Sequence, residues 1–238
     1  MGGFKKSRYK PHLKKCWCIN EGQDADFVAR MEDVLEVYSR PFDPLVPVVC
    51  MDEKPLQLLG EEKQEIIRES DGVRLQDERY IRNGTCSIFL FTEPLGGWRR
   101  AEALPQRRKV DWANQIKKLV DEDYPDAERI VLVMDNLNTH SVSSLYEAFP
   151  PDEAFRIMRK LEIHHTPKHG SWLDIAEIEL SALTNQCLDK RRIDNIEDLN
   201  AEMSTWYHDR NNSQKGVSWH FRTEDARIKL RRLYPKII

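Results

Sequence analysis

The chain has 238 residues, of which 40% are hydrophobic and 32% are charged. This length and balance indicate a globular protein with a sizeable core, built as one large domain or as one domain with a smaller appendage, and they exclude a low-complexity chain. No apolar run approaches the roughly 18 residues that span a bilayer, and no signal-peptide pattern opens the chain, so we expect a cytoplasmic protein that engages no membrane.

The charged residues are unevenly distributed, although the formal net charge is only −3. Lys and Arg crowd three stretches, at 5–15, 99–109 and 227–236. Such clusters suit a phosphate backbone, but a solvated surface explains any one of them equally well. The five cysteines show no disulfide-framework spacing, and Cys16 and Cys18 lack the two-residue spacer of most zinc knuckles, so we expect free thiols.

Hydrophobic periodicity predicts helices and strands in alternation. Residues 24–38 carry an apolar stripe at helical spacing, and the uninterrupted apolar run at 129–134 is typical of a strand covered on both faces. The full order is a helix at 24–38, a strand at 46–51, a strand meander at 79–104, a helix at 111–124, a strand at 129–134, helices at 141–149 and 151–161, a strand at 162–166, and helices at 172–188 and 195–210. This order predicts an α/β fold, a mixed sheet flanked by helices.

Two of the predicted strands run directly into an aspartate. The first strand ends at Asp52 and the strand at 129–134 ends at Asp135, while Glu177 lies on a later helix. Strand ends are rigid and open to solvent, so they suit polar functional groups. Three converging carboxylates repel one another unless cations neutralise them, and oxygen ligands select hard ions such as Mg²⁺ or Mn²⁺. A pair of such ions suits phosphodiester cleavage.

Each carboxylate also has an ordinary structural explanation. An aspartate at a strand end commonly forms a turn or caps a helix, and Glu177 could be a solvated helix residue. Glu53 would point away from Asp52 on a strand, so we interpret it as a neighbour rather than a ligand. From the residues alone, a metal-dependent site and these structural roles both stay open.

Three segments together resemble the motifs of the DDE transposases, in the mariner-like branch of bacterial insertion sequences. They are VVCMDEKP (48–55), VLVMDNLNTH (131–140) and HHTPKHGSWLDIAEIELSAL (164–183). The tail at 217–235 and the segment at 10–19 also resemble that family, so the resemblance covers nearly the whole chain. It implies a ribonuclease-H-like fold in which Asp52, Asp135 and Glu177 are the catalytic residues and bind two Mg²⁺ or Mn²⁺ ions.

The resemblance also implies a function in DNA transposition. The enzyme would cut a DNA strand at a transposon end, and the released 3′-hydroxyl would attack target DNA at a TA dinucleotide. Its partners would be double-stranded DNA, at the element ends and at the target, and a second copy of the chain in a homodimer assembled on DNA. It would act in the bacterial cytoplasm, at the nucleoid.

Two other functions stay open from the sequence. A truncated transposase that keeps its basic ends could bind DNA or a full-length partner without cutting. A different ribonuclease-H-like nuclease could use the same acids on RNA–DNA hybrids or branched DNA. Metal-dependent cleavage, compared across substrates, separates the three.

The candidates for a supporting or substrate-binding role around the acids are Asn136, His140, Lys168 and Asp174. Asp174 lies where the family usually has Asn, so it adds a negative charge one helical turn from Glu177 and competes with it as third ligand. The spacing from Leu173 favours Glu177. We expect His140 and Lys168 at the rim of the cleft in which the three carboxylates converge. The alternatives are a histidine that caps a helix and a solvated lysine.

The candidates for DNA contact are Arg99, Arg100, Arg107, Arg108 and Trp172. Because the evident source of affinity is clustered positive charge, we expect DNA affinity to fall steeply with salt. Trp172 could stack on an unpaired base, although a buried tryptophan that anchors the helix is the better explanation.

Three segments are expected: a basic N-terminal arm and helix leading into the catalytic domain at 1–44, a ribonuclease-H-like catalytic domain at 45–210, and a basic C-terminal tail packed on it at 211–238. Family members usually carry helix-turn-helix modules before the catalytic domain. This chain begins where those should have ended, by truncation, frameshift or design. Without such a module we expect little preference for element ends, since phosphate contacts carry no sequence information directly.

Overall fold

The computed structural model describes most of the chain, in the ranges 24–62, 66–67, 70, 74–75, 78–137, 140–189, 191–213 and 216–236. The expected basic arm and the cysteines before residue 24 lie outside the described residues. Cys50, Cys86 and Cys187 are buried free thiols, as the sequence predicted. None of the helices within the described ranges is long and apolar enough to cross a membrane.

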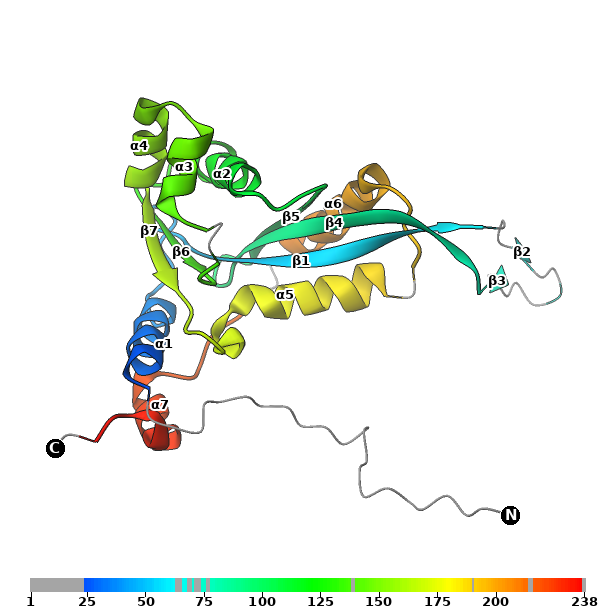
Figure 1. The fold of residues 1–238 in the computed structure, drawn as a ribbon. Coiled ribbons are helices and arrows are strands. Elements are labelled where there is room, and N and C mark those ends of the chain that lie inside the picture. Colours follow the sequence, from blue (N-terminus) through cyan, green and yellow to red (C-terminus); the bar gives the residue numbers. More distant parts are fainter. Residues whose placement is uncertain are drawn as a thin grey trace, which may run out of the picture.

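Five strands form one mixed sheet in the order β5-β4-β1-β6-β7 (Figure 1). Their bounds are β1 Val48–Glu61, β4 Tyr80–Glu93, β5 Trp98–Leu104, β6 Ile130–Met134 and β7 Leu161–His165. β1, β4 and β5 form an antiparallel meander, and β6 and β7 run parallel to β1. Between β1 and β4 in the chain, β2 (Ile66–Ile67) pairs with β3 (Arg74–Leu75) in a second, two-stranded sheet. The five-stranded order is that of the ribonuclease-H-like fold, so the predicted fold class is confirmed.

Helices cover both faces of this sheet (Figure 1). Their bounds are α1 Ala25–Tyr38, α2 Lys109–Lys118, α3 Val142–Ala148, α4 Pro151–Arg159, α5 Ile175–Leu183, α6 Ile196–Asn212 and α7 Thr223–Lys229. α2, α3 and α4 share a core with Met51 and Leu132, whereas α1, α5, α6 and α7 share a second core with Cys50 and Val133. Side chains alternate along a strand, so neighbours such as Cys50 and Met51 enter different cores. β6 is apolar at every position because helices cover both of its faces.

Two predicted elements are wrong in their bounds. β1 does not end at Asp52 but continues to Glu61, because β4 pairs with it in antiparallel register along its length. The helix expected at 172–188 is interrupted: a short 3₁₀ turn precedes Asp174, and α5 begins only at Ile175. The first difference leaves Asp52 inside a long strand, and the second makes Asp174 a helix cap.

The C-terminal tail packs against α1. Ala226 of α7 and Leu233 are buried in the core that α1 covers, and the backbone N–H of Asp24 donates to the carbonyl oxygen of Leu233 at 3.1 Å. On the surface, Arg227 pairs with Glu32 at 2.8 Å. Part of the basic charge of the tail is therefore used within the chain.

Candidate active site

The strand register places Asp52 beside Asp135. Met51 on β1 pairs with Met134, the last residue of β6, and each aspartate follows one residue later. Neighbouring strands lie about 4.8 Å apart, so the two aspartates occupy adjacent positions just past the last pair of the ladder. The ladder between β1 and β6 ends at this pair, which puts both carboxylates at its boundary.

Glu177 reaches the same face of the sheet from α5. Asp52 alternates with Met51 along β1, so it shares the face of Cys50, which lies in the core that α5 covers. α5 runs alongside β1 (Figure 1), and Glu177 is an exposed residue in its first turn, directly after two buried ones. Asp52 and Glu177 therefore share one side of the sheet, and Asp135 lies beside Asp52, just past the end of β6.

The carboxyl groups of these residues interact electrostatically. Burial, with the negative charges of Asp135 and Glu177 added, raises the pKa of Asp52 to about 6. The pKa of Asp174 lies well above its usual range, first because the group is buried and then because it is close to Asp52. Burial is the larger cause for both groups, and the repulsion from the other acids adds to it, which indicates that these carboxylates lie near one another.

These oxygen donors fit a hard divalent cation. Carboxylates are the ligands that Mg²⁺ and Mn²⁺ prefer, and a carboxyl whose pKa is raised to about 6 gains from a nearby positive charge. Within the described residues, no three acidic, histidine or cysteine side chains already surround a common point as a finished metal site. The candidate metal centre therefore rests on strand register and electrostatic coupling rather than on coordination distances.

Asp174 and Glu177 differ in exposure and in their hydrogen bonds. Asp174 is 4% exposed and caps α5, with the backbone N–H of Ala176 donating to its Oδ1 at 2.9 Å. Glu177 lies one turn further along the helix and is exposed. The sequence left Asp174 open as a competing ligand, whereas the structure gives it a capping role and leaves Glu177 accessible.

His140 is buried behind Asp135, so our expectation that it lies at the rim of the cleft is wrong. It is 2% exposed, its Nδ1 lies 2.7 Å from Oδ1 of Asp135, and its Nε2 lies 2.9 Å from Oε1 of Glu53. Burial by itself lowers the pKa of the imidazole, but the hydrogen bonds to Asp135 and Glu53 outweigh it and raise the pKa to about 9. Glu53, whose carboxylate accepts the inner hydrogen bond of the ring, lies on β1, far from His140 in the sequence.

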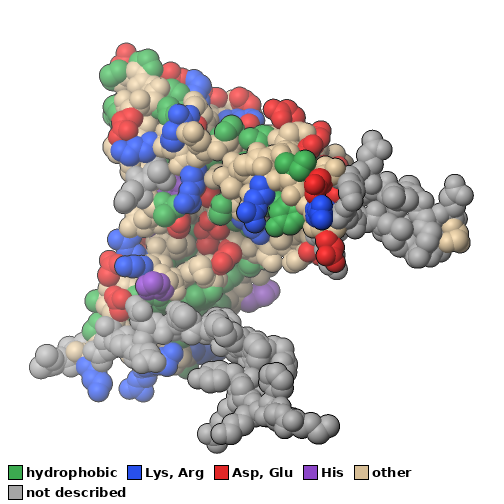
Figure 2. Space-filling model, turned by 45° about the vertical axis from the view of Figure 1, so that its right-hand side comes forward, with side chains coloured by type: hydrophobic (Ala, Val, Ile, Leu, Met, Phe, Trp, Pro, Cys, Tyr) green, Lys and Arg blue, Asp and Glu red, His purple; other side chains and the backbone are tan. Residues whose placement is uncertain are grey.

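A pocket of about 470 Å³ opens beside Asp135. Asn136 and Lys168 are exposed and line it, together with Arg30 of α1 and Thr166. Figure 2 shows Asp and Glu side chains within the hollow of one face of the molecule, with Lys, Arg and His side chains around it. Positively charged side chains therefore lie next to the candidate acids.

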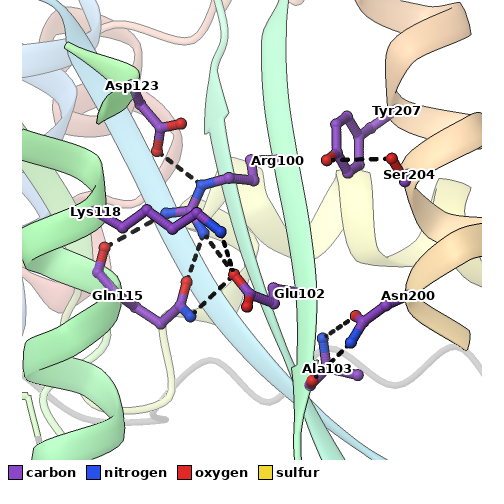
Figure 3. A network of polar contacts seen from close by, with 9 residues as sticks. All are labelled: Arg100, Glu102, Ala103, Gln115, Lys118, Asp123, Asn200, Ser204 and Tyr207. Atoms are coloured by element: carbon purple, nitrogen blue, oxygen red, sulfur yellow. Dashed lines mark hydrogen bonds and ion pairs between the residues drawn. The ribbon is translucent and has the colours of Figure 1, made fainter. Parts of the chain in front are cut away.

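Arg99 and Arg100 are buried, which corrects the prediction that they contact DNA. Arg99 is 1% exposed, and its Nε lies 3.1 Å from Oε2 of Glu179, whose other oxygen lies 3.1 Å from Arg210. Arg100 is 6% exposed and pairs with Asp123 at 2.7 Å, within the polar network of Figure 3. The two guanidinium groups leave β5 on opposite faces and are each covered by helices, so neither reaches a phosphate.

Of the other candidates for DNA contact, the two arginines are exposed and the tryptophan is partly buried. Arg107 and Arg108 are exposed just before α2, although Arg108 also donates from Nε to Asp111 at 3.0 Å. Trp172 is partly buried and packs edge-to-face on Phe221, with ring centroids 5.8 Å apart. That packing favours an anchoring role for Trp172 over stacking on a base.

Two cationic residues near the acids escaped the sequence analysis. Lys54 shares the face of Asp52, two residues further along β1, and its Nζ donates to Oγ1 of Thr184 at 2.5 Å. Arg30 lines the pocket beside Asp135. Strand alternation was a sufficient signal to find Lys54, whereas nothing in the sequence brings α1 next to the end of β6.

Residues 47–200 match the family model described as DDE superfamily endonuclease. No curated protein matches the chain in sequence.

The fold is similar to that of several solved structures of the Mos1 mariner transposase. The paired end complex with Mn matches 94% of this chain and 65% of its own, at 15% identity and a TM-score of 0.55. The pre-cleavage transpososome matches 100% and 69%, at 15% identity and a TM-score of 0.56. The isolated catalytic domain matches 87% and 93%, at 12% identity and a TM-score of 0.53. The chain thus spans 65% of the length of the first of these proteins, and the likeness shows a shared fold.

Proposed function

The chain belongs to the DDE superfamily endonucleases, and we propose that it is the catalytic domain of a mariner-like transposase from a bacterial insertion sequence. It cuts DNA strands at the transposon ends and joins the released 3′-hydroxyl to target DNA, in the cytoplasm and at the nucleoid. The fold shared with the Mos1 structures supports this reaction, since these are described as a paired end complex and a strand transfer complex.

Asp52, Asp135 and Glu177 are the proposed ligands of two Mg²⁺ or Mn²⁺ ions. Mos1 complexes described with Mn and with Mg support this choice of metal. When bound, such ions supply positive charge at the phosphodiester that is cleaved. The chain itself supplies rigid placement, because pairing with β4 holds Asp52 and a helix start holds Glu177.

The register between β1 and β6 is the observation that carries this assignment. Since Met51 pairs with Met134, Asp52 and Asp135 leave the ladder together. The pKa of Asp52, raised to about 6 by burial and then by Asp135 and Glu177, supports one shared site for the three acids. A role as helix cap, the ordinary explanation for such acids, belongs to Asp174.

Duplex DNA is the proposed partner, with two copies of the chain assembled on it. Lys168 at the pocket beside Asp135, and Arg107 and Arg108 before α2, suit contacts to phosphates. Contacts of this kind orient the duplex without reading its sequence, so we expect this domain to add little preference for the element ends.

Strand cleavage on defined substrates tests the proposal. A labelled duplex that carries an element end is incubated with Mg²⁺ or Mn²⁺, beside a random duplex and an RNA–DNA hybrid. We expect the wild type to nick the DNA duplexes only with metal and to join the new 3′-hydroxyl to a target plasmid. Asp135→Asn and Glu177→Gln should abolish both steps while the fold, followed by circular dichroism, is kept.

Other outcomes would redirect the assignment. Wild type that binds the duplex but never nicks it would favour a non-cleaving binder, and preferred cleavage of the hybrid would favour a different nuclease. Asp174→Asn is the matched control, because asparagine caps a helix as well as aspartate does. Its activity should stay close to wild type, and a folded but inactive Asp174→Asn would make Asp174 the third ligand instead of Glu177.

A further inference from the structure

Two buried side chains, Glu53 and His140, form a chain of hydrogen bonds that ends on the partly exposed Asp135. The imidazole of His140 bridges two carboxylates, with 2.9 Å from Nε2 to Oε1 of Glu53 and 2.7 Å from Nδ1 to Oδ1 of Asp135. An ionised carboxylate only accepts hydrogen bonds, so each ring nitrogen donates to its own partner. The three side chains come from β1, from the end of β6 and from the start of the segment that leads into α3.

The inner end of this chain is held firmly. The side chains of His140 and Glu53 are 1% and 2% exposed, so water does not compete for their hydrogen bond. The ring stacks on the fully buried Trp112, with centroids 6.0 Å apart and planes 26° apart, and the backbone N–H of His140 donates to Leu137 at 3.0 Å. These contacts fix both the position of the imidazole and the rotation of its ring.

The outer end needs that support. Asp135 lies one residue beyond Met134, where pairing of β6 with β1 and β7 stops, and its side chain is 38% exposed. Asp52 needs no such device, because β4 pairs with β1 on both sides of it. A carboxylate on an exposed strand end has free rotamers unless a side chain restrains it.

We infer that His140 is a positioning residue: anchored by Glu53, it holds the Asp135 carboxylate in the orientation in which that carboxylate meets a divalent cation. The inference rests on the proposed function, because it takes Asp135 to be a metal ligand. Hydrogen bonds from neighbouring side chains orient metal ligands in this way, and their loss typically weakens metal affinity about 10–100-fold. Glu53, which the sequence marked only as a neighbour of Asp52, becomes the anchor of the arrangement.

Two substitutions at His140 separate positioning from packing. In asparagine the amide nitrogen is bonded to Cγ, as Nδ1 is in histidine, so His140→Asn keeps a donor toward Asp135. In glutamine the amide lies one bond further out, so His140→Gln keeps a donor toward Glu53 and loses the one toward Asp135. Both variants lose the aromatic ring against Trp112, and both should therefore lose similar thermal stability.

The measurement is Mn²⁺ affinity by titration calorimetry on the full chain without DNA. We expect His140→Gln to bind Mn²⁺ about 10–100-fold more weakly than wild type, and His140→Asn to stay within a few-fold of wild type. Equal affinities in the two variants would overturn the inference and leave His140 a packing residue. Wild type that binds Mn²⁺ but cuts no DNA would overturn the proposed function alone, and wild type that binds no Mn²⁺ would overturn both.

Discussion

Asn200 on α6 hydrogen-bonds both backbone groups of Ala103 on β5 (Figure 3). The N–H of Ala103 donates to Oδ1 of Asn200 at 2.7 Å, and Nδ2 of Asn200 donates back to the carbonyl oxygen at 3.1 Å. Asn211 makes the same pair of bonds to Arg99, at 2.9 Å and 2.8 Å. β5 is the edge of the sheet, so two asparagine side chains take the place of a missing strand and cover an edge open to aggregation.

Removing either asparagine should therefore destabilise the fold. Asn200→Ala and Asn211→Ala each leave a backbone N–H and carbonyl of β5 without their partner, and we expect a loss of about 1–3 kcal/mol in the free energy of unfolding. Urea denaturation measures it. Asn212→Ala, an exposed asparagine next to Asn211 on the same helix, is the control and should change stability little.

Neutralising Asp52 should stabilise the metal-free protein. The folded-state pKa is about 6 against an ordinary value of 3.8, so ionisation destabilises the folded chain above pH 6, and that cost vanishes below about pH 4. Asp52→Asn should thus gain on the order of 3 kcal/mol at about pH 8 and nothing at about pH 3. Thermal melts in a chelator measure this, with the exposed Asp126→Asn as control. A gain that is the same at both pH values would contradict the electrostatic explanation.

Two glutamates on α5 should respond in opposite ways. Glu179 is 2% exposed between Arg99 and Arg210, so Glu179→Ala leaves buried positive charge unbalanced and should cost about 3–5 kcal/mol of stability. Glu177→Ala removes an exposed side chain two residues away and should leave stability nearly unchanged while abolishing cleavage. Denaturation and nicking assays on both variants check this, and a stable Glu179→Ala protein would show that the ion cluster is dispensable.

Glu162 should contribute to stability only at mildly acidic and higher pH. Burial raises its pKa, but hydrogen bonds from His164, Arg40 and Arg129 outweigh it and lower the pKa to about 2. A lowered folded-state pKa means stability that is present above the ordinary value of 4.5 and is lost as pH falls toward 2. Wild type should therefore exceed Glu162→Gln in urea midpoint at about pH 6, and the two midpoints should meet near pH 2. A constant difference would rule out this linkage.

DNA affinity should fall with salt less steeply in variants of the exposed arginines. If Arg107 and Arg108 contact phosphates, the plot of log affinity against log salt should lose about 0.9 in slope for each contact removed by alanine. Fluorescence anisotropy with a random duplex measures the slope. Arg159→Ala, an exposed arginine at the end of α4 before β7, is the control. Slopes equal to that of wild type in the Arg107→Ala and Arg108→Ala variants would remove both arginines from the interface.

The sequence by itself determined the elements and the acids they carry. The run Ile130–Met134 and the stripe of α1 are local patterns, and burial on one or both faces is written into their spacing. Asp135 follows the first of these directly, so its place at a strand end could be predicted. Asp52 was predicted on the right strand but at its end, whereas it lies inside the strand. Pairing with β4, which the sequence pattern of β1 does not reveal, continues β1 beyond Asp52.

Only the tertiary structure decided which polar residues serve the fold. Arg99 and Arg100 read as surface charge because arginine is seldom buried without a partner, and the partner of Arg99, Glu179, lies far along the chain. His140 is likewise buried because a partner distant in the sequence, Glu53 on β1, forms a hydrogen bond with its ring. A buried charge or hydrogen bond is stable only when its complement is in place, and periodicity within one segment carries no information about a complement that another segment supplies.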